Sequence, residues 1–169
     1  MGLFRRRPRP GEPTEPTGRQ SNDSPQEPVP PVEYSGIASG GPGEQPVFTL
    51  YEFQTAGGVW VRLHDMQFLG FDYRVQPATL TMRFVYDDPE WTPPDARETP
   101  VAVFTFGAVQ VWQWENDHDV VETPVEARGQ VNHLEPHEPT NVFSLGTMNT
   151  TLLFSAARLD VHLEPLAGA

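Results

Sequence analysis

The sequence predicts an all-β fold: a single antiparallel β-sandwich or partly open barrel of about 8–10 short strands. In most segments after residue 46, apolar and polar residues alternate with the period of two that a half-buried strand requires. Gly, Pro, Asn and Asp separate these segments, and no window shows the 3.6-residue apolar stripe of an amphipathic helix. The length of 169 residues fits one domain of this kind.

The stretch from Trp60 to Tyr86 contains the clearest hairpin. Its two segments, FDYRV and LTMRFVY, are separated by a turn at Gln76-Pro77-Ala78. Alternation along both segments places these side chains on a core-facing side: Phe71, Tyr73, Val75, Leu80, Met82, Phe84 and Tyr86.

Other segments supply the remaining strands. VFTLYEF (47–53) and VWVRL (59–63) flank an Ala56-Gly57-Gly58 turn, which predicts a second hairpin. In VAVFTFGAVQVWQWE (101–115), Gly107 interrupts the alternation and predicts a bend where the inward face switches. The expected closing strands are 142–145, 150–155 and 158–164, with a turn at 146–149. Between residues 120 and 141 only fragments near Val121 and Val131 are expected.

The first 46 residues differ in composition from the rest. They hold ten of the nineteen prolines and few large apolar side chains, so they cannot bury enough surface to offset the entropy of ordering. We predict a disordered tail over residues 1–46 and a β-rich globular domain over residues 47–169.

Charge and composition narrow the function. The net charge is −12, of which −11 falls within residues 47–169. This field opposes nucleic-acid binding and favours a basic protein partner, although acidity also serves solubility alone. The chain has no cysteine, and all eleven basic residues are arginine, which excludes thiolate-metal and lysine chemistry and is typical of GC-rich bacterial genes. Without a membrane-spanning apolar run or a secretory leader, we expect a cytoplasmic protein with no stable membrane association.

Three groups of polar residues invite a chemical interpretation. His64-Asp65 could form an acid–base pair, but an Asp at a turn commonly caps its own backbone. The 115–119 segment, ENDHD, is rich in oxygen ligands for Ca²⁺ but lacks the EF-hand spacing. His133 and His137 have the spacing of zinc ligands on a helix, but Pro136 and Pro139 oppose a helix there, so the spacing loses its meaning. We predict no metal, no cofactor and no catalytic residue.

The four tryptophans could form a platform for a carbohydrate, but at least two are expected to complete the core or its rim. Trp91 differs, because it stands in the Pro-rich acidic segment DDPEWTPPDARETP and should be exposed. An exposed Trp beside carboxylates is typical of an anchor for a protein partner.

Three segments, taken in order, carry a family resemblance: LHDMQFLGFDYRVQPATLTMRFVY, VAVFTFGAVQVWQW and NTTLLFSAARLDVHLE. The residues that carry it are Leu63, His64 and Asp65, then Phe106, Gly107 and Val109 with Ala108 intervening, then Phe154, Ala156 and Leu159. Together they resemble the small β-rich immunity proteins of bacterial polymorphic toxin systems. The resemblance implies a cytosolic, non-catalytic protein that binds and blocks a cognate toxin. The Pro-rich tail departs from this pattern.

We therefore predict a non-catalytic binding domain whose acidic loops attract a basic partner, a toxin if the resemblance holds. The residues expected to contact the partner are Asp87, Asp88, Glu90, Trp91, Asp95, Asp117 and Asp119. One alternative is a scaffolding β-module whose tail makes the contacts. The other is a metal-dependent hydrolase that uses His64 and acidic residues.

Overall fold

The described part of the chain is built almost entirely of β-strands. A computed structural model describes residues 30–38, 53–116, 129–137 and 140–166. Within these ranges there are two 3-10 helices, η1 (Leu63–Asp65) and η2 (Pro94–Ala96). The strands are β1 (Glu33–Ser35), β2 (Phe53–Gln54), β3 (Trp60–Val61), β4 (Gln67–Arg74), β5 (Thr79–Val85), β6 (Val101–Gly107), β7 (Gln110–Asn116), β8 (Val131–His137), β9 (Val142–Thr147), β10 (Thr150–Ser155) and β11 (Arg158–Glu164).

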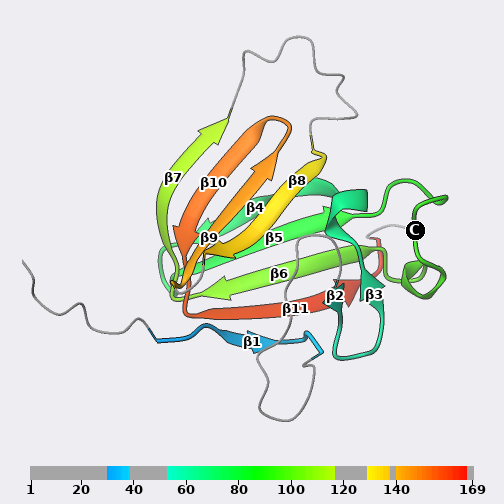
Figure 1. The fold of residues 1–169 in the computed structure, drawn as a ribbon, viewed down its shortest axis with the longest axis horizontal. Helices are drawn as coiled ribbons and strands as arrows, with labels where there is room; N and C mark the ends of the chain where they lie inside the picture. The colour runs from blue at the N-terminus through cyan, green and yellow to red at the C-terminus, as the bar shows by residue number, and fades with distance from the viewer. Residues whose placement is uncertain (1–29, 39–52, 117–128, 138–139, 167–169) are drawn as a thin grey trace, which may run out of the picture.

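Two sheets make a sandwich-like fold, which confirms the predicted fold class. The larger sheet has five strands in the order β1-β11-β6-β5-β4, and the smaller has four in the order β7-β10-β9-β8. Strands β2 and β3 pair separately. Figure 1 shows the four-stranded sheet inclined to the five-stranded one. Strands β2 and β3 lie near the start of β6 and the end of β11.

The core consists of the inward faces of both sheets. From β5 and β6 it takes Leu80, Met82, Phe84, Phe104 and Phe106, all fully buried. Phe106 joins the sheets, because its ring lies 4.7 Å from that of Phe154 on β10 and 5.1 Å from that of Phe143 on β9. Each buried aromatic of this kind stabilises the fold by about 1.5–3 kcal/mol, which makes this cluster the main link between the layers.

The predicted bend at Gly107 is where the chain passes from one sheet to the other. β6 ends at Gly107 in the five-stranded sheet, and β7 begins at Gln110 in the four-stranded sheet. Between them Ala108 has φ = 56°, a left-handed conformation that turns the backbone sharply.

The hairpin of β4 and β5 is confirmed, but one of its faces is less buried than expected. Along β5, alternate side chains are buried as predicted. On the partner strand Phe71 is half-buried and Tyr73 is exposed, and Val75, which follows the strand, is exposed as well. The prediction was wrong for these two residues because β4 is an edge strand with a bulge between Phe68 and Gly70, and Val75 lies in the turn beyond its last paired residue, Arg74.

One segment of the expected tail is part of the larger sheet. Residues 33–35 form β1, which pairs in parallel with β11 through Tyr34 and Leu159. Val32 and Ile37, on either side of β1, are buried in the core. Averaging the composition over 46 residues concealed this short apolar segment, whose partner lies far away in the chain. The remaining residues of the expected tail, 1–29 and 39–46, lie outside the described ranges.

The other strand predictions are confirmed where the structure describes the residues. β2 and β3 pair as expected, although residues 47–52 are not described. The fragment near Val131 is the full strand β8, while that near Val121 lies outside the described residues. The three closing strands are confirmed as β9, β10 and β11.

Contrary to the prediction, the tryptophans are not buried in the core. Trp60, Trp91, Trp112 and Trp114 are all between 47% and 61% exposed. The expectation is therefore confirmed only for the exposed Trp91. Trp114 contacts a core-rim aromatic, Phe71. Trp112 and Trp114 lie on β7, an edge strand, where alternation does not ensure burial. Within the described residues there is no helix with the length and hydropathy that crossing a membrane requires.

The contact of β1 with β11 gives a first prediction. At Gly36, φ is +76°, and a Cβ atom would stand 1.8 Å from the carbonyl oxygen of Val161. Gly36→Ala should therefore push β1 away and lower the free energy of unfolding by at least about 2 kcal/mol. Urea denaturation measures the change.

Gly57→Ala is the matched control. Gly57 has no positive φ, and its nearest neighbour to an added Cβ, Thr55 Oγ1, is 3.8 Å away. The control should change stability by less than about 0.5 kcal/mol. Equal stability of the two variants would contradict the proposed role of the β1–β11 contact.

Candidate functional site

A recess of about 640 Å³ brings several predicted site residues together, and we call it the acidic pocket. Its walls come from η1, the start of β4, the connection between β5 and β6, and the residue preceding β8. The lining residues are His64, Asp65, Gln67, Asp87, Asp88, Pro89, Trp91 and Gln130.

The first wall is η1, whose orientation follows from what it buries. Leu63 and Met66 are fully buried, so the short helix turns the intervening His64-Asp65 pair towards solvent. His64 Nε2 lies 3.1 Å from Asp65 Oδ1. The pair thus forms a structured corner of the fold, as the sequence favoured, and its carboxylate faces the pocket.

The second wall is the β5–β6 connection, which is wound around Asp88. The Asp88 carboxylate accepts a 2.8 Å hydrogen bond from the Glu90 amide. Its backbone carbonyl accepts from the Trp91 and Thr92 amides, at 3.2 and 3.1 Å, and from the Thr92 hydroxyl at 2.8 Å. These bonds fix the loop while Trp91 remains 60% exposed, so the indole is presented to solvent at little further entropic cost.

A buried tyrosine ties these two walls together. The Arg62 amide donates a 2.6 Å hydrogen bond to the Tyr86 hydroxyl, and the hydroxyl donates back to the Arg62 carbonyl at 3.5 Å. Burial raises the pKa of Tyr86, with smaller contributions in the same direction from Asp65 and Asp95. The tyrosine therefore stays protonated at neutral pH and holds η1 against the start of the acidic loop.

The third wall comes from the segment that leads into β8. Gln67 and Gln130 form an isolated antiparallel bridge, and the Phe68 amide donates a 2.6 Å hydrogen bond to the Gly129 carbonyl. The bridge places two side-chain amides beside the carboxylates. Amides donate and accept hydrogen bonds without adding charge.

The electrostatics of the pocket suit a cationic ligand. Three carboxylates, those of Asp65, Asp87 and Asp88, line it with one imidazole. Carboxylates pair with guanidinium or ammonium groups, and a neighbouring indole face attracts the same cations. Among the described residues no group of three His, Cys, Asp or Glu side chains is arranged to hold a metal ion.

The predicted contact residues divide into three sets. Asp87, Asp88 and Trp91 line the pocket, and Glu90 is exposed in the same loop. Asp95 is exposed on η2 but does not line it. Asp117 and Asp119, with most of the 115–119 segment, lie outside the described residues.

The two histidines with the spacing of zinc ligands lie on a strand. His133 and His137 lie on β8, a strand that contains Pro136, and not on a helix. The His133 ring is 2.9 Å from the Ser144 hydroxyl and lies against Gly146, where a Cβ atom would clash with it.

Sequence reasoning missed Asp65, Gln67 and Gln130 as pocket residues. Asp65 was considered only with His64, and its nearness to Asp87 depends on the Tyr86–Arg62 contact. Gln130 reaches the pocket through a single bridge to Gln67, which leaves no signal in the alternation.

Comparison with known proteins adds no constraint. No protein-family model matches the sequence, and no curated protein or solved structure matches it either.

Replacing the tyrosine tests the link between the walls. Tyr86→Phe removes the hydrogen bond that the part-buried Arg62 amide donates to the tyrosine hydroxyl, and it should lower the free energy of unfolding by about 1–2 kcal/mol. Hydrogen exchange should show faster opening at residues 62–66. Unchanged stability and exchange would contradict the role assigned to this bond.

The same residue predicts a pH dependence. The pKa of Tyr86 is raised in the folded state above its ordinary value of 10.0, so the folded protein holds this proton more tightly than the unfolded chain. The raised pKa contributes to the free energy of unfolding, and this contribution is fully present below about pH 10. It is lost as the pH rises through the pKa that Tyr86 has in the folded state. Denaturation between about pH 9 and pH 11 should show a steeper loss for the wild type than for Tyr86→Phe. Parallel curves would contradict the burial of the hydroxyl.

Proposed function

We propose that the protein is a non-catalytic binding domain that captures a basic segment of a partner protein in the acidic pocket. The observation that carries the proposal is the convergence of Asp65, Asp87, Asp88 and the exposed Trp91 on one recess. An arginine or lysine side chain of the partner would enter between the carboxylates, and its stem would pack on the indole.

The long-range charge supports the same partner. Residues 47–169 carry −11 of the net −12, so a basic protein is attracted before it makes contact. Attraction of this kind raises the association rate, whereas a desolvated aromatic anchor mainly lowers the dissociation rate. The pocket supplies both kinds of group.

The family resemblance supports a more specific version of the proposal. If it holds, the partner is a cognate toxin, and the domain acts in the cytoplasm as its immunity protein by occupying a basic surface of the toxin. The pocket chemistry is compatible with this role, because nucleic-acid-degrading and other basic toxins present arginine and lysine side chains at their working surfaces.

A single charge change tests the pocket. The partner is first captured with the tagged full-length protein, identified and purified. Asp87→Asn should then lower its association rate constant about two- to fivefold at low ionic strength and weaken the salt dependence. Stopped-flow binding measures both effects.

Asp72→Asn is the matched control, because it removes the same charge from an exposed site on β4 outside the pocket. An equal effect of both substitutions would indicate general charge attraction. An association rate that does not respond to ionic strength would contradict the proposal.

Trp91 and the tail separate the proposal from the scaffolding alternative. Trp91→Ala should raise the dissociation constant about 30-fold, the effect of losing an interface anchor. Deletion of residues 1–29 should leave binding intact. The deletion must stop there, because Val32 and Ile37 are buried in the core and residues 33–35 form β1. Loss of binding on deletion, with Trp91→Ala silent, would favour the tail.

A further inference from the structure

A second recess, the terminal recess, lies where β4 runs past the end of the four-stranded sheet. It has an inner hollow of about 410 Å³ and an outer one of about 480 Å³. Asn116, Asn149 and Thr150 line both, so the two hollows are adjacent. The volumes fall in the range of small-molecule sites, about 300–1,000 Å³.

The inner hollow is aromatic. The Trp114 ring meets Phe71 edge to face, with centroids 5.3 Å apart, and is 61% exposed. Gly70, at the β4 bulge, lines the same hollow as Trp114. Its backbone is accessible, since an added Cβ atom would have no neighbour within 4 Å, and its φ of +135° favours glycine. A strand glycine of this kind allows a ligand to approach the backbone closely.

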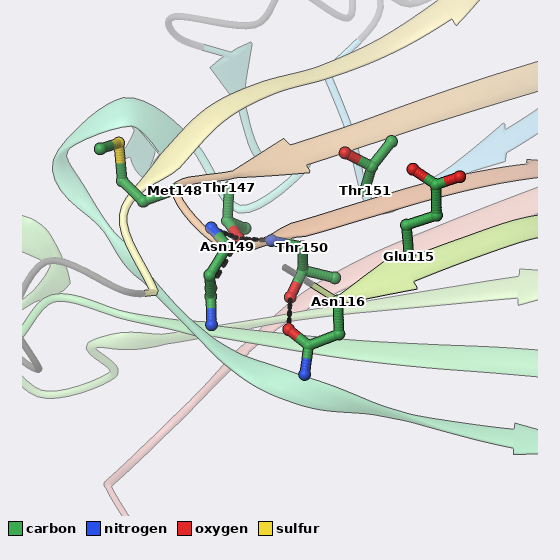
Figure 2. Close-up of a pocket in the computed structure, with 7 residues that line it drawn as sticks. All are labelled: Glu115, Asn116, Thr147, Met148, Asn149, Thr150 and Thr151. Carbon is green, nitrogen blue, oxygen red and sulfur yellow. Dashed lines mark hydrogen bonds between the residues drawn. The ribbon is translucent and has the colours of Figure 1, made fainter. Parts of the chain in front are cut away.

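The outer hollow is polar and its side chains are held in place (Figure 2). The Thr147 hydroxyl accepts hydrogen bonds from the Thr150 amide at 3.0 Å and the Asn149 amide at 3.4 Å, and donates to Asn149 Oδ1 at 3.2 Å. The Thr150 hydroxyl donates to Asn116 Oδ1 at 3.3 Å. Figure 2 shows the side-chain amide nitrogens of Asn116 and Asn149 pointing away from these threonines.

The chemistry of the lining selects the class of ligand. Among the described residues that line the two hollows, Glu115 is the only charged one, so the described lining offers no counter-charge to an anionic ligand. Amides and hydroxyls both donate and accept hydrogen bonds, as sugar hydroxyls do. An exposed indole offers a flat apolar surface to the C–H face of a pyranose ring. We propose that the terminal recess binds a neutral oligosaccharide of two or three sugar units.

A neighbouring tryptophan provides a matched control. Trp114 pairs with Leu152 of β10, but the register then shifts, and Trp112 stands in the bulge without a paired residue. A bulge re-aims side chains, and Trp112 does not line either hollow although it is 52% exposed on the same strand. Trp112→Ala thus removes the same side chain from an exposed position outside the site.

The experiment uses the indole signals of the full-length protein. Four tryptophans give four indole ¹H–¹⁵N cross-peaks, and single Trp→Phe variants assign them. Maltotriose, cellotriose, xylotriose and triacetylchitotriose are each titrated to about 10 mM, which detects millimolar dissociation constants. At least one should shift the Trp114 signal with saturation, leaving the Trp91 and Trp112 signals in place.

Variants connect the shift to the recess. Trp114→Ala should weaken binding at least tenfold, and Thr150→Val, which removes one hydroxyl, should weaken it about threefold to tenfold. Trp112→Ala should leave the affinity unchanged. The spectrum of each variant reports whether it is folded, and Thr150→Val and Trp114→Phe keep the test available if Trp114→Ala does not fold.

The outcomes separate this proposal from the protein-binding function. Binding that Trp114→Ala weakens and that Asp87→Asn and Trp91→Ala leave unchanged supports the terminal recess as an independent site. If none of the four sugars shifts the Trp114 signal, or if a shift is centred on Trp91 or Trp112, the proposal is overturned. Failure of the partner experiment has no bearing on this result, because the two sites share no lining residue.

Discussion

The arrangement of the two recesses depends on one close approach of two backbones, where Gly129 meets Phe68. The Phe68 amide donates a 2.6 Å hydrogen bond to the Gly129 carbonyl, and a side chain at Gly129 would stand 2.8 Å from the Phe68 carbonyl oxygen. Only glycine fits there without movement. Through this contact and the adjacent Gln67–Gln130 bridge, β4 of one sheet is joined to the start of β8 in the other.

The same junction lies between the two recesses and contributes to each. Gln67 and Gln130 line the acidic pocket, whereas Phe68 and Gly129 line the inner hollow of the terminal recess. Successive residues of β4 therefore line hollows of different chemistry, the acidic pocket and the aromatic inner hollow. The other walls of the two recesses come from different loops. A substitution in one of these loops can therefore change the chemistry of one recess without changing the other.

Much of the fold could be predicted because burial on one face imposes an alternating pattern. β5, β10 and β11 follow this pattern and were located correctly, and Gly107 marked the bend between the sheets. Edge strands were harder to predict. Tyr73 and Trp112 alternate as core residues would, yet β4 and β7 each have a strand on one side only.

The candidate site was only partly predictable. The acidic loop and Trp91 were evident from composition, because charge and proline content are local properties. The other walls depend on contacts between distant segments, such as the bond between the Arg62 amide and Tyr86, which lie 24 residues apart. No pattern in the sequence predicts that a polar side chain such as Gln130 lines a pocket. Its role appears only once the sheets are assembled.

The position of β1 also constrains how the protein is made. Ser35 of β1 and Asp160 of β11, whose side chains share a 2.6 Å hydrogen bond, are 125 residues apart in the chain. During translation β1 leaves the ribosome long before its only strand partner among the described elements exists. The hairpin of β4 and β5 can form at once, but this edge of the five-stranded sheet must wait for β11. Until then Val32 and Ile37 are exposed apolar groups on the nascent chain, available to a chaperone.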